Sequence, residues 1–139
     1  MSRNLLVCVL AVGFVLWLSV VPLLAHHSFA AEFDNSKPVK VTGKVVKVEW
    51  MNPHIWFYVD GKDETTGRTA VWGFSGGPPA TMARRGIKKD AMRIGDVVKV
   101  EGFLAKDGSN LANSSTVKLS DGRRVFAGSS SESGTTPNP

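Results

Sequence analysis

Apolar and polar residues alternate along much of the chain between residues 39 and 119, and this period of two predicts β-strands. We expect five strands, at residues 39–50, 54–60, 69–74, 97–104 and 116–119. Pro78 and Pro79 mark the start of a short predicted helix from Pro79 to Arg85, and Gly86 marks its end. The expected order is therefore three strands, a helix and two strands.

The first strand changes phase partway along. Alternate residues from Val39 to Val45 share one face, whereas those from Val46 to Trp50 take the opposite phase. A pattern that slips by one residue predicts a β-bulge, which bends a strand.

This order predicts an all-β fold, a five-stranded OB-like Greek-key barrel with one short helix. A bent first strand fits this prediction, because such a strand can serve both halves of a barrel. A generic small β-sandwich is the alternative.

Aromatic residues are concentrated in the second and third strands. In the second, Phe57 faces the same way as its apolar neighbours at 55 and 59, and Trp56 and Tyr58 face the opposite way. We expect Trp56, Tyr58, Trp72 and Phe74 to form a ligand-binding surface, because OB barrels bind oligosaccharides and oligonucleotides on this face. The alternative is that the segment before the first strand covers these rings and makes a second small core.

The N-terminus predicts export. An apolar run from Leu5 to Val21 follows Arg3 and ends near the small residue Ala25, which is typical of a signal peptide over residues 1–25. Cleavage after Ala25 predicts a periplasmic protein, and an uncleaved inner-membrane anchor is the alternative. Cys8 lies in this run, so the mature chain would hold neither a disulfide nor a thiolate metal site.

The remaining chain is short enough for one domain. We expect a lead-in segment at residues 26–37 that forms a helical turn ended by Pro38, a barrel domain at 38–127 and a disordered tail at 128–139. The net charge is +5, but the basic residues are scattered among acids, and export argues against a nucleic-acid partner. We expect no membrane span after cleavage.

The three histidines suggest a metal site. If cleavage follows Ala25, His26 offers its terminal amine and its imidazole to one ion, and His54 or His27 could supply a further imidazole. Such nitrogen ligands favour copper, as in a histidine brace. The alternatives are that His54 only caps a turn and that the histidine pair is merely a polar start to the mature chain.

Several motifs together resemble the exported bacterial family named domain of unknown function 6152. They are Ala25–Asp34, Gly43-Lys44-Val45, Val48–His54, Arg84-Arg85-Gly86, Gly95–Val98, Lys106–Ser109 and Asp121-Gly122-Arg123. The resemblance implies a small periplasmic domain. It implies no activity and no catalytic residues.

We therefore predict an exported domain that binds an unknown small ligand or an envelope protein, without catalysis. Copper binding is the alternative function, and a purely structural role in an envelope complex is another. Catalytic patterns are weak, because Ser28 and His27 have no acid placed to complete a triad. The acids near residue 63 fit a solvated turn better than a calcium loop.

Overall fold

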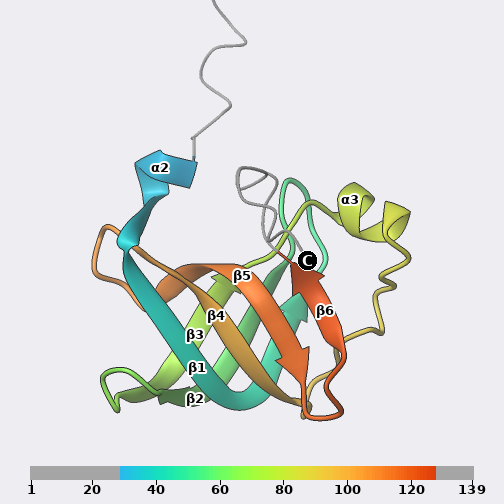
Figure 1. Ribbon diagram of the computed structural model, residues 1–139. Coiled ribbons are helices and arrows are strands. Elements are labelled where there is room, and N and C mark those ends of the chain that lie inside the picture. Colours follow the sequence, from blue (N-terminus) through green and yellow to red (C-terminus); the bar gives the residue numbers. More distant parts are fainter. Residues whose placement is uncertain (1–28, 128–139) are drawn as a thin grey trace, which may run out of the picture. The chain divides into compact units, whose positions relative to one another are not determined.

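The computed structural model describes residues 29–127, which form a β-rich protein with two short helices (Figure 1). The elements in chain order are α2 (Phe29–Glu32), β1 (Phe33–Glu49), β2 (Trp56–Asp63), β3 (Thr69–Ser75), α3 (Pro79–Arg84), β4 (Val97–Ala105), β5 (Leu111–Leu119) and β6 (Arg124–Ala127). The chain divides into two compact units, and the second, Glu32–Pro139, holds every one of these strands. A search of the described residues finds no helix long and apolar enough to cross a membrane.

All six strands belong to one sheet, in the order β3-β2-β1-β4-β5-β6, and neighbours in this order are antiparallel. A further, parallel pairing joins β3 to β5 through three residue pairs, from Gly73 opposite Leu111 to Ser75 opposite Asn113. Each strand from β1 to β5 therefore has a hydrogen-bonded neighbour on both sides.

The predicted bulge in β1 is confirmed. The register between β1 and β2 shifts between Val45 and Lys47, so that Val45 lies opposite Val59 while Lys47 lies opposite Tyr58. The shift exposes Val46 and turns Val48 towards the buried core. This is the phase change that the apolar pattern indicated.

The core is built from alternate residues of β1 to β5. Residues at 55, 57 and 59 around β2 are fully buried, as the alternation predicted. Phe57 stacks on Phe74 of β3, with ring centroids 5.4 Å apart. The helix α3 contributes the fully buried Met82, whose packing in the core holds the helix against the sheet.

Two glycines allow β1 and β2 to approach closely. Gly43 lies opposite Gly61, and a Cβ atom on Gly61 would lie 2.6 Å from the carbonyl oxygen of Thr42. Backbone atoms cannot move aside as a side-chain end can, so the pairing requires residues without side chains at this crossing.

Several expected boundaries were wrong. The lead-in segment is helical only over Phe29–Glu32, and β1 begins at Phe33, which pairs with Ala105 of β4; Pro38 therefore lies within the strand. Extra pairing also lengthens β2 to Asp63 and starts β5 at Leu111.

The short strand β6 was not predicted, whereas α3 matches the expected helix to within one residue. The predictions for the signal peptide, for the start of the lead-in segment and for the tail fall on residues 1–28 and 128–139, outside the described part of the chain. They stand as predictions.

Candidate functional site

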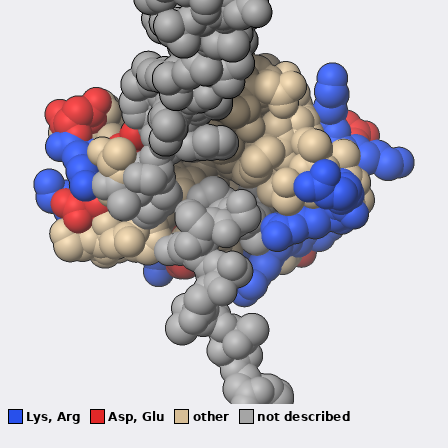
Figure 2. Space-filling model, turned by 90° about the horizontal axis from the view of Figure 1, so that it is seen from above, with Lys and Arg blue, Asp and Glu red and all other residues tan. Residues whose placement is uncertain are grey.

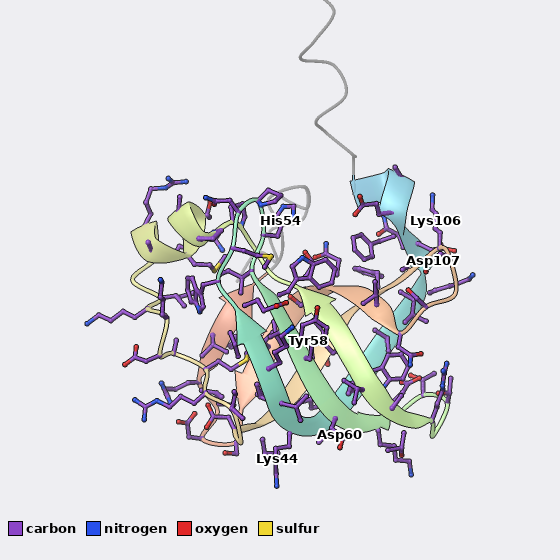
Figure 3. The ribbon with its side chains drawn as sticks, turned by 180° about the vertical axis from the view of Figure 1, so that it is seen from behind. Lys44, His54, Tyr58, Asp60, Lys106 and Asp107 are labelled. Atoms are coloured by element: carbon purple, nitrogen blue, oxygen red, sulfur yellow. The ribbon has the colours of Figure 1, made fainter. Side chains whose placement is uncertain are left out.

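The outward face of β2 carries two half-buried aromatic side chains, Trp56 and Tyr58. Strand alternation places them there, because their neighbour Phe57 is fully buried in the core. In Figure 3, Tyr58 lies in the middle of the sheet, His54 lies at its upper end, and Lys44 and Asp60 lie at its lower edge. Lys44 and Asp60 are direct partners across β1 and β2.

Cross-strand pairing assembles a row of residues around Tyr58. Tyr58 lies opposite Lys47 of β1 on one side and opposite Gly73 of β3 on the other, and Gly73 lies opposite Leu111 of β5. We call these four residues the outer row. Side chains that face each other across strands share one face of a sheet, so the row crosses four strands on the outward side.

Gly73 lets Tyr58 lie across β3. A Cβ atom on Gly73 would lie 3.1 Å from Cε1 of Tyr58 and 2.7 Å from Cδ2 of Leu111. Both side chains therefore rest above the glycine, where any other residue would push them away. The result is a continuous surface made from an aromatic ring and an aliphatic side chain.

Two opposite charges border this surface. Lys47 Nζ lies 2.7 Å from a carboxylate oxygen of Glu49 and 5.2 Å from the centroid of the Tyr58 ring. The hydrogen bond to Glu49 raises the pKa of Lys47, and the same bond lowers the pKa of Glu49, to which a hydrogen bond from Tyr58 also contributes. Both groups are therefore charged at neutral pH, and they present a donor and an acceptor beside the ring.

Two of the four expected ligand-binding residues do not lie on this face. Trp72 is only 3% exposed and Phe74 is fully buried, so the prediction that both lie outward beside Trp56 and Tyr58 was wrong. The reason is the register: Val59 lies opposite Trp72 and Phe57 lies opposite Phe74, which places both rings on the core face.

Trp72 is held firmly in the core position. Its indole Nε1 donates a hydrogen bond to the carbonyl oxygen of Gly61 at 3.2 Å, and the Arg68 guanidinium lies 5.7 Å from its ring centroid. The indole thus has a structural role.

The histidines give no assembled metal site in the described region. His54 is half-buried in the loop between β1 and β2, directly after the cis bond between Asn52 and Pro53. His26 and His27 lie outside the described residues. Within residues 29–127, no group of three side chains suited to hold a metal ion occurs. The copper brace stays a prediction, which a copper(II) titration of the processed protein and its His54→Ala variant tests.

Sequence reasoning identified only Tyr58 among the four residues of the outer row. It had no reason to single out Gly73 or Leu111, because the parallel pairing of β3 with β5 joins segments that are distant in the sequence. Lys47 could have been found, since the predicted bulge changes which β1 residues face Tyr58.

A family model described as a family of unknown function, DUF6152, matches residues 15–114. No curated protein and no solved structure matches the chain.

Proposed function

We propose that this chain, which belongs to the DUF6152 family, is an exported OB-like barrel domain that binds a ring-shaped polar ligand on the outer row. The proposal includes no catalytic step. The apolar segment before Ala25 supports export to the periplasm, because it has the length and charge pattern of a signal peptide.

The strand pairing supports an OB-like barrel. Five strands follow one another as β1-β2-β3-β5-β4 and return to β1, and a helix connects β3 to β4. The OB fold is a five-stranded Greek-key barrel, and its second and third strands form the usual ligand face. The outer row lies across these same strands.

One observation carries the binding proposal: the half-buried ring of Tyr58 rests over Gly73, and the exposed Lys47 ammonium, paired with Glu49, lies over that ring. An aromatic face stacks on flat or weakly polar ring surfaces, and the charged pair can bond to hydroxyl groups at the ring edge. A pyranose unit of an oligosaccharide combines both features. Export makes a saccharide a more accessible ligand than a nucleic acid.

The test begins with a glycan array presented to the exported, processed protein, followed by calorimetric titration of the best saccharide. We expect saccharide binding that weakens at least tenfold in Tyr58→Ala, which removes the ring. We expect the same loss in Gly73→Leu, whose side chain pushes the Tyr58 ring out of its position over β3. Ile94→Ala is the control, because Ile94 is an exposed apolar residue outside the row.

The proposal is wrong if no saccharide binds, or if Tyr58→Ala and Ile94→Ala bind the saccharide equally well. A protein that co-purifies with the chain and is released by Tyr58→Ala would instead indicate that the row docks an envelope protein.

A further inference from the structure

A concave surface lies between the end of β1 and the segment that runs from α3 to Lys89. It is a groove of about 570 Å³ formed by Trp50, by residues of α3, and by Gly86 to Lys89. Cavities that hold small ligands commonly measure about 300–1,000 Å³, so the groove has room for one small molecule. None of the residues that line the groove belongs to the outer row, and ligand binding in the groove does not depend on the proposed saccharide site.

The floor of the groove is apolar and fixed in place. Trp50 and Ile87 are partly buried and pack against the core, and Ala83 adds a methyl group from α3. The helix itself is anchored by the fully buried Met82, whose carbonyl oxygen accepts a hydrogen bond from the Ile87 amide at 3.0 Å. The groove is therefore built into the fold and needs no rearrangement to form.

The rim of the groove is cationic. Lys88 and Lys89 line it, and both are exposed; among the described residues neither makes an ion pair. The nearest acid in sequence, Asp90, is engaged by Arg93 at 3.7 Å. Figure 2 shows lysine and arginine atoms gathered on the right of the molecule, the side on which α3 lies in Figure 1.

An apolar floor beside unneutralised lysines is complementary to one ligand chemistry. We propose that the groove binds a small amphipathic anion, with an aliphatic chain against Trp50 and Ile87 and a carboxylate between Lys88 and Lys89. The chain would remove apolar surface from water, and the carboxylate would take the position of a counter-ion. A neutral molecule with the same chain would gain only the first contribution.

The experiment compares octanoate with 1-octanol, which share the aliphatic chain and differ in charge. Each is titrated at low salt into the processed protein, and the amide signals of Gly86 and Ile87 are followed by NMR. We expect saturable shifts with both compounds and about fivefold tighter binding of octanoate, since each exposed ion pair contributes only modestly.

Three variants separate the contributions of charge and apolar contact. Lys88→Gln combined with Lys89→Gln should remove the preference for octanoate, whereas the matched pair Lys62→Gln and Lys118→Gln, on exposed strand positions, should keep it. Ala83→Leu should block both compounds by filling the groove, and a leucine at this exposed helix position preserves the fold.

Three outcomes would overturn the proposal. They are equal binding of octanoate and octanol, unchanged octanoate binding in Ala83→Leu, and shifts at Gly86 that arise only with phosphatidylglycerol vesicles and never with monomeric octanoate. The last outcome would assign the lysines to a membrane surface rather than to a groove ligand.

Discussion

Replacement of Phe57 and of its neighbour Tyr58 by alanine should have very different effects on stability. Phe57 is fully buried and stacks on Phe74 with an angle of 18° between the ring planes, whereas Tyr58 is half-buried on the outward face. Truncating a buried phenylalanine loses its transfer free energy and leaves a cavity, which together cost about 3–5 kcal/mol. Truncating a half-buried tyrosine should cost about 1–2 kcal/mol, since less apolar area returns to water.

The free energy of unfolding can be measured for each variant by urea denaturation, followed by circular dichroism. We expect Phe57→Ala to lose about 1–4 kcal/mol more than Tyr58→Ala, the difference between these two ranges, with an unchanged slope of the free energy against urea concentration. A small domain has about 5–15 kcal/mol in all, so Phe57→Leu provides a milder version where the alanine variant does not fold. A double-mutant cycle of Phe57→Leu with Phe74→Leu should give a coupling of about 0.5–1.5 kcal/mol, the usual range for aromatic pairs.

The opposite order of stabilities would refute the reasoning. If Tyr58→Ala lost as much stability as Phe57→Ala, the faces of β2 would be exchanged, as happens when a strand shifts its register by one residue. The outer row and the saccharide proposal would then fail together. A coupling near zero between positions 57 and 74 would contradict only the stacking.

Three further outcomes follow from the packing. Gly61→Ala should lower the free energy of unfolding by about 1–3 kcal/mol in thermal denaturation, because its Cβ would lie 2.6 Å from the Thr42 carbonyl oxygen; an unchanged midpoint would contradict the close strand crossing. Met82→Ala should cost about 2–5 kcal/mol and speed the hydrogen exchange of the α3 amides, and unaltered exchange would show that another contact holds the helix. Burial raises the pKa of Asp63, but hydrogen bonds, the strongest from the Thr66 hydroxyl, outweigh burial and bring the pKa below 3.8. The ionised carboxylate therefore stabilises the fold above pH 3.8, and this stabilisation is lost as the pH falls through the lowered pKa. Asp63→Asn should therefore be less stable at pH 7 and approach the wild type in acid, and a constant difference in unfolding midpoint across that range would contradict this assignment.

Alternation along single strands was enough to predict much of the fold. The buried positions around Phe57 and the bulge after Val45 both follow from local patterns, because alternation within one strand shows which side chains share a face. The helix Pro79–Arg84 was predictable for a similar reason, since prolines and glycines mark helix ends locally.

The relation between strands was harder to predict. Trp72 and Phe74 have the same alternation whether they face inward or outward, and their face depends on how the turn after Asp63 sets the register of β3 against β2. A shift of one residue separates the expected aromatic surface from the observed one.

Polar strands were also missed. The N-terminal half of β5 contains Asn113, Ser114 and Ser115, a composition more typical of a loop. These residues form a strand because buried polar groups find partners there: the Ser114 hydroxyl donates to the carbonyl oxygen of Ser75 at 2.8 Å. Such a bond links residues 39 positions apart, and no local pattern reports it.

The pairing of β3 with β5 also covers part of a sheet edge to which strands of other chains could otherwise add. β3 lies at one end of the sheet order and contains Val71, Trp72 and Phe74, and an unpaired apolar strand of this kind is a template on which other chains can add strands. At Gly73 to Ser75 that edge is already occupied by β5. At the other end of the sheet order, β6 is only four residues long and begins with Arg124, so that end offers little for amyloid-like growth.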